Sequence, residues 1–176
     1  MAARGMIHVY YGDGKGKSTA AIGLAVRALG QGMRVCLLQF WKGTPTGECL
    51  LLEGIQGLRI LRGQNNGKSF AAMSEAERSA MLACHRTMLA QALAWVRQGE
   101  LDMLVLDEVL DAILLSMVDE QALQALLQDK PTSLELVITG HQPVPWVMAC
   151  ADYITHMVKE RHPFDRGQIA RRGIEF

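Results

Sequence analysis

The sequence predicts a three-layer α/β/α fold built on a mostly parallel β-sheet. Strand-like and helix-like segments alternate along the chain, as they do in folds of this class. Several strand-like segments are apolar over most of their length, as expected where helices cover both faces of a sheet. The chain has 176 residues and shows neither a linker nor an internal repeat, so we expect residues 1–176 to form a single domain.

The first part of the chain forms a βαβ unit. Residues 7–11 are rich in β-branched and aromatic side chains and lead into glycines, which predicts a strand. Apolar residues then recur at helical spacing from 18 to about 31, where Gly30 and Gly32 end the pattern. Residues 34–40 form a second, largely apolar strand. We therefore expect these two strands to be parallel, with a right-handed crossover.

The same alternation continues through the rest of the chain. Ser74 and Glu77 match a capping box, which opens a long helix that extends to about Gln98. We expect a second helix at 119–127, a mobile loop at 63–67 and an irregular tail at the end of the chain. Further strands are expected at 58–61, 103–106, 134–138 and 152–158.

The composition argues against several classes of protein. The 18 basic and 18 acidic residues give a net charge of zero, so we expect no nucleic-acid partner. No apolar stretch approaches the ~18 residues of a membrane span, and the first residues lack the apolar segment of a signal peptide. The cysteines form no C-x-x-C pair and are expected to be thiols; they are Cys36, Cys49, Cys84 and Cys150. These features predict a cytoplasmic protein that does not bind a membrane.

A phosphate-binding loop is predicted between the first strand and the first helix. Glycines allow successive backbone N–H groups to face one anion, and the helix that follows adds the positive end of its dipole. Lys17 would contact the outer phosphates, and the hydroxyl of Ser18 suits Mg²⁺. The alternative is a glycine-rich turn without a ligand. We call this segment the phosphate loop; it consists of Gly12, Asp13, Gly14, Lys15, Gly16, Lys17, Ser18 and Thr19.

The phosphate loop is one residue shorter than the usual pattern. Four residues normally separate the first glycine from Gly-Lys-Ser/Thr, whereas Gly12 leaves three and Tyr11 occupies the expected glycine position. We therefore expect a P-loop NTPase-like fold that holds its triphosphate differently from an ordinary ATPase.

Two acids, Asp107 and Glu108, end the buried strand at 103–106. Ligands of open α/β sheets bind at the carboxyl ends of the strands, so both acids should lie near the phosphate loop. With Ser18 they could hold Mg²⁺ directly or through water. In the alternative interpretation they only cap the turn that follows.

Over nearly its whole length the chain resembles the ATP:corrinoid adenosyltransferases. In that family a Co(I) corrinoid attacks the 5′ carbon of ATP and expels triphosphate. The resemblance therefore implies a transferase with ATP, Mg²⁺ and a corrinoid as its ligands, in which Lys17, Ser18 and Glu108 act on the leaving triphosphate. It rests on the phosphate loop and on Gln39-Phe40-Trp41-Lys42-Gly43, Gly47-Glu48, Val105-Leu106-Asp107-Glu108, Ala151-Asp152 through Lys159, His162-Pro163-Phe164-Asp165, Gly167 and Gly173-Ile174-Glu175-Phe176.

The resemblance also implies further binding residues and partners. It implies a homodimer and a reductase that supplies electrons to the corrinoid. Family members usually carry a Phe-x-Trp segment whose aromatics remove the lower ligand of the corrinoid. Here residues 67–73 contain one aromatic, which either does part of that work or belongs to a surface lid. A histidine also replaces a common family arginine after Thr139-Gly140. The residues placed at the nucleotide or corrinoid are Arg27, Phe40, Trp41, Phe70 and His141.

Two other functions stay open from the residues alone. A P-loop nucleotide kinase or NTPase would also use Lys17, Ser18 and Glu108, but it needs an acceptor site that the sequence does not reveal. A regulatory protein that binds ATP or a corrinoid without turnover would fit the reduced aromatic segment.

Overall fold

The computed structural model describes residues 4–42, 46–63, 68 and 70–175. Its centre is a six-stranded sheet in the order β3-β2-β4-β5-β1-β6, and every pair of neighbouring strands is parallel. The predicted α/β class and parallel sheet are therefore confirmed. The strands are β1 (Ile7–Tyr11), β2 (Val35–Gln39), β3 (Leu58–Arg62), β4 (Met103–Asp107), β5 (Glu135–Gly140) and β6 (Tyr153–His156).

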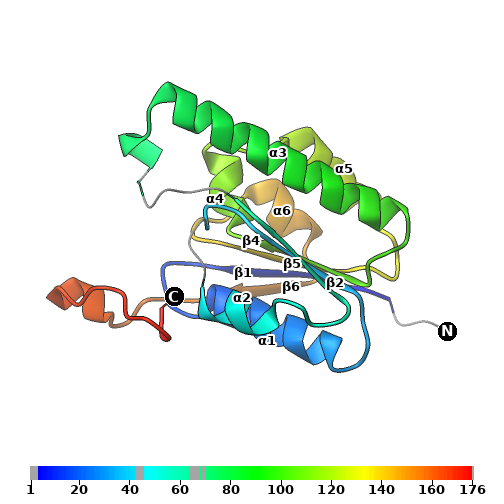
Figure 1. Cartoon of the computed structure of the whole chain (residues 1–176), viewed down its shortest axis with the longest axis horizontal. Helices are drawn as coiled ribbons and strands as arrows, with labels where there is room; N and C mark the ends of the chain where they lie inside the picture. The colour runs from blue at the N-terminus through cyan, green and yellow to red at the C-terminus, as the bar shows by residue number, and fades with distance from the viewer. Residues whose placement is uncertain (1–3, 43–45, 64–67, 69, 176) are drawn as a thin grey trace.

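Helices cover both faces of this sheet (Figure 1). One face carries α1 (Lys17–Leu29) and α2 (Gly47–Leu52). The other face carries α3 (Glu75–Arg97), α4 (Val109–Leu114), α5 (Glu120–Gln128) and α6 (Pro145–Cys150). Two short 3₁₀ helices complete the description: η1 (Phe70–Ala72) before α3, and η2 (Pro163–Arg166) in the tail.

The central strands are apolar because both of their faces are buried. All five residues of β2 and of β4 are buried. Along β2 the side chains alternate: Cys36 and Leu38 join the core beneath α3, while Val35 and Leu37 join the core beneath α1. This alternation follows from the two-residue period of a strand and explains the unbroken apolar run in the sequence.

The long helix begins where its capping box predicts. The Ser74 hydroxyl accepts a hydrogen bond from the N–H of Glu77 at 3.3 Å, and the Glu77 carboxylate accepts one from the N–H of Ser74 at 2.8 Å. The helices α2, α4 and α6 were not predicted. Each has six residues, fewer than two turns, which is too short for an apolar period to show. Of the loop expected at 63–67, residues 64–67 lie outside the described residues.

The parallel strands end at one edge of the sheet, and the phosphate loop leaves β1 at this edge (Figure 1). After β6 the last segment of the chain also leaves from this edge and extends beyond the body of the protein (Figure 1). Within the described ranges, no helix combines the length and apolarity needed to cross a bilayer. The carboxyl edge of the sheet is thus where the predicted site residues can meet.

Candidate functional site

The glycines of the phosphate loop have two different roles. Gly12 and Gly16 have φ angles of 121° and 117°, in the region that favours glycine, and Gly16 is the residue just before α1. A Cβ atom on Gly14 would lie 2.7 Å from the carbonyl oxygen of Met157, and the N–H of Gly14 donates to that oxygen at 2.8 Å. The loop therefore curls at Gly12 and Gly16, while Gly14 allows the segment after β6 to pack against it, as does Gly12, whose Cβ would lie closer still to the same oxygen.

Lys17 lies at the start of α1 and folds back over the loop. Its Nζ donates to the carbonyl oxygen of Gly14 at 2.9 Å. Burial lowers the pKa of Lys17, and the acids Asp111 and Glu108 oppose that effect. The first turn of α1 leaves backbone N–H groups without partners inside the helix, as every helix start does. An ammonium group and a helix N-terminus therefore face the same small region, which suits a polyanion.

Asp107 is wholly buried at the end of β4 and has four polar partners. Its Oδ1 accepts from the hydroxyls of Ser18 and Thr139, each at 2.8 Å. Its Oδ2 accepts from Lys42 Nζ at 2.7 Å and from Gln39 Nε2 at 3.3 Å. A carboxylate has about four acceptor positions, so this one is saturated. Asp107 therefore fixes the Ser18 hydroxyl at the phosphate loop, and a metal could bind it directly only by displacing a partner.

Lys42 follows β2 and was not predicted as a site residue. Its Nζ contacts Asp107 and also lies 3.3 Å from the Ser18 Oγ. Burial acts to lower the pKa of Lys42, but the charge and hydrogen bond of Asp107 outweigh it, so the pKa is raised above its ordinary value. A charged ammonium group therefore sits between the serine and the aspartate that were predicted to hold a metal.

Glu108 lies at the first position after β4 in an unusual backbone conformation. Its φ of 63° and ψ of 22° are left-handed, and its N–H donates to the Thr139 hydroxyl at 2.8 Å. Its side chain makes no capping hydrogen bond to α4, contrary to the alternative in which the acids only cap the turn. Burial raises the pKa of Glu108. The Glu108 carboxylate is therefore not used to cap the helix that it precedes.

Glu108 lines an open cleft of about 310 Å³ beside the phosphate loop. The rings of Trp41 and Phe70 meet edge to face in its wall, with their centroids 5.8 Å apart. His141 Nδ1 lies 3.2 Å from the Asp111 carboxylate, and this hydrogen bond raises the pKa of His141. The cleft therefore combines an aromatic wall with ionisable groups. Its full lining is Trp41, Lys68, Phe70, Glu108, Asp111, Leu115 and His141.

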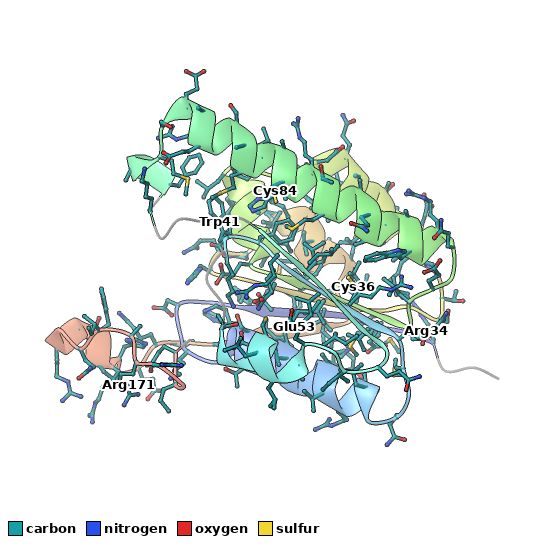
Figure 2. The ribbon with its side chains drawn as sticks, in the orientation of Figure 1. Arg34, Cys36, Trp41, Glu53, Cys84 and Arg171 are labelled. Atoms are coloured by element: carbon teal, nitrogen blue, oxygen red, sulfur yellow. The ribbon has the colours of Figure 1, made fainter. Side chains whose placement is uncertain are left out.

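The position of Trp41 is fixed by contacts with the buried side chain of His85. Its φ is 65°, and its backbone N–H points to His85 Nε2 at 3.4 Å. His85 is wholly buried, and burial lowers its pKa to about 4, so the ring is neutral near pH 7 and can accept this bond. Phe40 packs edge to face on the same histidine and is itself wholly buried. The structure therefore places Phe40 in the core and presents Trp41 at the cleft, at the carboxyl edge of the sheet (Figure 2).

The last segment of the chain reaches back to the phosphate loop. Lys15 Nζ lies 2.8 Å from Glu175 Oε1, and Arg171 pairs with the same carboxylate at 3.2 Å. The hydrogen bonds from Arg171 and then from Lys15 lower the pKa of Glu175 to about 2. The N–H of Lys159 donates to Asp13 Oδ1 at 3.1 Å. The tail thus contributes both charges and backbone contacts to the loop; Figure 2 shows Arg171 on it.

The structure brings most of the predicted site residues together at one edge of the sheet. Arg27 is the exception, because it lies in the last turn of α1. At 1.5 Å per residue it is ~15 Å along the helix axis from Lys17. Gly43, Ser69 and Phe176, which belong to the segments singled out in the sequence, lie outside the described residues.

Four residues of this cluster were missed by the sequence analysis. Three of them are polar residues at the end of a buried strand or just after it, and that position is the signal that could have found them, whereas Asp111 lies inside α4. The four are Gln39, Lys42, Asp111 and Thr139.

Comparison with known proteins gives consistent matches. Residues 3–176 match the model of a family described as ATP:corrinoid adenosyltransferase BtuR/CobO/CobP. A corrinoid adenosyltransferase of Escherichia coli (strain K12) is 33% identical over 174 residues, with 98% of this chain and 86% of the relative covered. Corrinoid adenosyltransferase CobA of Salmonella typhimurium is 34% identical over 184 residues, with the same coverage of 98% and 86%. A corrinoid adenosyltransferase of Pseudomonas aeruginosa is 31% identical, covering 98% of this chain and 84% of the relative.

Proposed function

The chain belongs to the ATP:corrinoid adenosyltransferase family BtuR/CobO/CobP, and from this premise we propose how its residues transfer the 5′-deoxyadenosyl group of ATP to a corrinoid. It is an enzyme, a transferase with ATP and a corrinoid as substrates. One observation supports the proposal most: the Ser18 hydroxyl of the phosphate loop binds Asp107 at 2.8 Å, and the next residue, Glu108, opens onto an aromatic cleft. A triphosphate site and a site for an apolar ring therefore adjoin.

We propose that the phosphate loop holds the triphosphate as it leaves. The cobalt–carbon bond forms at the 5′ carbon while the bond from that carbon to oxygen breaks, and its electron pair departs with the triphosphate. The oxygens that develop charge would face Lys17 and the first turn of α1. A preorganised donor of this kind is worth about 3 kcal/mol of barrier lowering. Cobalt is the nucleophile, so the step needs no serine–histidine pair and no carboxylate base.

We propose Mg²⁺ at the Ser18 hydroxyl and the Glu108 carboxylate. Both are hard oxygen donors, and Mg²⁺ in phosphate sites is usually held by one or two carboxylates, substrate phosphates and water. The described part of the chain contains no group of three His, Cys, Asp or Glu side chains that would form a cage, which agrees with such a sparse site. Asp107 would act on the metal site through the Ser18 hydroxyl, because its own oxygens are taken. When bound, Mg²⁺ supplies positive charge to the leaving phosphates.

We place the adenosine part of ATP in the cleft and the corrinoid over its aromatic rim. A volume of about 310 Å³ is at the lower end for small-molecule pockets and suits a nucleoside better than a corrinoid macrocycle. Trp41 and Phe70 form the apolar wall on which the macrocycle would rest. This arrangement directs the 5′ carbon at the boundary between the two substrates.

The remaining proposals concern the setting of the reaction. Co(I) has to be generated from Co(II), so we propose a reductase that donates the electron. We propose a homodimer because apolar side chains on the projecting tail are exposed and suit burial against a second copy; they are Phe164, Ile169 and Ile174.

The cysteines are thiols, which supports a cytoplasmic location. Because one sheet organises the described residues, we infer that residues 1–176 act as one nucleotide-binding domain.

The test is an anaerobic absorbance assay with ATP, Mg²⁺ and chemically reduced cob(I)alamin, following a light-sensitive adenosylated product. We expect wild type to turn over many times and Lys17→Met to be slower by at least ~100-fold, the effect of removing one preorganised donor. Arg86→Met is the matched control, because it removes one cation from the exposed side of α3. A rate near that of wild type in Lys17→Met would contradict the assignment of the phosphate loop.

A further inference from the structure

A lysine ammonium group lies beside one of the two oxygen donors proposed for a metal ion. Lys42 Nζ is 2.7 Å from Asp107 Oδ2 and 3.3 Å from Ser18 Oγ, and Ser18 Oγ is itself 2.8 Å from Asp107 Oδ1. The three polar groups therefore form a closed triangle of a hydroxyl, a carboxylate and a cation. Ser18 is one of the two residues proposed to bind Mg²⁺, so Lys42 contacts the oxygen that the metal would use.

Lys42 is the partner of Asp107 that can leave. Gln39 and Thr139 are wholly buried and belong to β2 and β5, so their side chains are fixed by the sheet. The side chain of Lys42 is 20% exposed and follows the end of β2. Lysine also carries its charge on a flexible four-carbon stem. A change at this cluster would therefore move Lys42 first.

Asp107 needs a cation beside it throughout the reaction. Its carboxylate is wholly buried, and a buried carboxylate without a compensating charge is strongly disfavoured. If Lys42 moves away, another positive charge has to take over. A metal ion that arrives with the nucleotide and binds the Ser18 hydroxyl would supply that charge.

We propose that Lys42 is a second lysine of the triphosphate site. It neutralises Asp107 beside Ser18 while the site holds no nucleotide, and it turns to the phosphates when the metal binds with ATP. The inference rests on the proposed function, in which Ser18 and Glu108 hold Mg²⁺. Two consequences follow. The empty protein binds a free divalent cation weakly, because Lys42 competes for the same oxygens, and the leaving triphosphate meets the charges of both Lys17 and Lys42.

The chain offers a matched control at the opposite end of the same two strands. Arg34 precedes β2 and Asp102 precedes β4, and their side chains pair at 2.8 Å. Figure 2 shows Arg34 at the far edge of the sheet from Trp41. Arg34→Met therefore removes a cation from a carboxylate, as Lys42→Met does, but far from the phosphate loop. Lys42→Gln is the second test variant, because its amide can still donate a hydrogen bond to Asp107 if the methionine variant does not fold.

The first measurement is Mn²⁺ binding to nucleotide-free protein, followed by electron paramagnetic resonance. We expect Mn²⁺ to bind ~10-fold more tightly to Lys42→Met and Lys42→Gln than to wild type, because the competing ammonium is gone and Asp107 lacks its ion pair. The second is calorimetric titration with inorganic triphosphate at saturating Mg²⁺, the condition in which the proposal releases Lys42 from Asp107. Here the same variants should bind ~10-fold more weakly, because one phosphate cation is lost. Arg34→Met should match wild type in both titrations.

Three outcomes would overturn the inference in different ways. Unchanged Mn²⁺ affinity would show that Lys42 does not occupy the metal position. Tighter Mn²⁺ binding with unchanged triphosphate affinity would show that Lys42 only neutralises Asp107. Failure of wild type to bind Mn²⁺ even with ATP would contradict the metal site of the proposed function, and the inference would fall with it.

Discussion

Replacing Thr139 by valine tests whether the Thr139 hydroxyl holds Asp107 and Glu108 in place, and through Asp107 the hydroxyl of Ser18. The Thr139 hydroxyl is wholly buried, donates to Asp107 Oδ1 at 2.8 Å and accepts the N–H of Glu108 at 2.8 Å. Valine has nearly the same shape as threonine, so it leaves no cavity and removes only the two hydrogen bonds. Both the Ser18 partner and the left-handed Glu108 depend on this one side chain.

The expected loss of stability follows from these two bonds. A hydrogen bond to a charged group contributes about 1.5–3 kcal/mol, and a buried N–H left without an acceptor costs about 1–3 kcal/mol. The two effects share one network and are not fully additive, so we expect the free energy of unfolding of Thr139→Val to be about 3 kcal/mol lower than that of wild type. For a chain of 176 residues this lowers Tm by roughly 6–12 °C.

The assay is urea denaturation followed by circular dichroism, together with the rate of adenosyl transfer. Thr139→Ser is the control because it keeps the hydroxyl and loses only a methyl group, and it should lose about 1 kcal/mol. We also expect Thr139→Val to react more slowly, since Glu108 is no longer held. Stability within about 1 kcal/mol of wild type, or an equal loss in Thr139→Ser, would refute the argument from the two hydrogen bonds.

Three further predictions concern single residues of the site. In urea titration the free energy of unfolding of Glu108→Gly should equal that of wild type or exceed it by up to ~1 kcal/mol, because glycine relieves the left-handed φ of 63°. The rate of adenosyl transfer should fall by at least ~100-fold. Burial lowers the pKa of His85 from 6.5 to about 4, so the unfolded chain gains a proton first as the pH falls. Neutral His85 therefore contributes up to ~3 kcal/mol to the free energy of unfolding; this contribution is complete above pH 6.5 and is lost between that pH and pH 4. In denaturant titrations His85→Phe should not show this pH dependence. His141 has a raised pKa owing to its hydrogen bond with Asp111 and loses its charge as the pH rises through that value. Triphosphate affinity measured by calorimetry should therefore decline with rising pH in wild type, and His141→Arg should not show the decline.

Each of these predictions has a clear contrary result. Glu108→Gly that is less stable than wild type by more than ~1 kcal/mol would show that the left-handed backbone carries no strain. An identical loss of stability toward acid pH in wild type and His85→Phe would mean that another group titrates there. The same pH dependence of triphosphate affinity in wild type and His141→Arg would show that the charge of His141 in the cleft does not act on the neighbouring triphosphate.

The positions of the strands could be predicted because they depend on local patterns. Unbroken apolar runs such as that of β2 occur where both faces of a strand are covered, and the structure buries all five residues of β2. The capping box at Ser74 depends on two residues three positions apart, and it marks the start of α3 correctly. The short helix α4 escaped prediction because its six residues make fewer than two turns.

The site could be predicted only in part. The meeting of Ser18 with Asp107 follows from the rule that parallel strands end at one edge of a sheet, although 89 positions separate the two residues. The rule gives the edge but not the partners, so it could not assign Lys42 to Asp107. Phe40 was misplaced for a related reason. An aromatic residue after a strand suits either a cleft or the core, and only packing against His85 decides for the core.

The most direct test of the account identifies what ATP becomes. Wild-type protein would be incubated anaerobically with Mg²⁺, cob(I)alamin and ATP labelled with ¹³C at the 5′ carbon, and the products would be resolved by nuclear magnetic resonance and mass spectrometry. The account predicts that the label is attached to cobalt and that intact inorganic triphosphate appears in equal amount. ADP or orthophosphate, with the label still in a nucleotide, would show a kinase or NTPase and would contradict it.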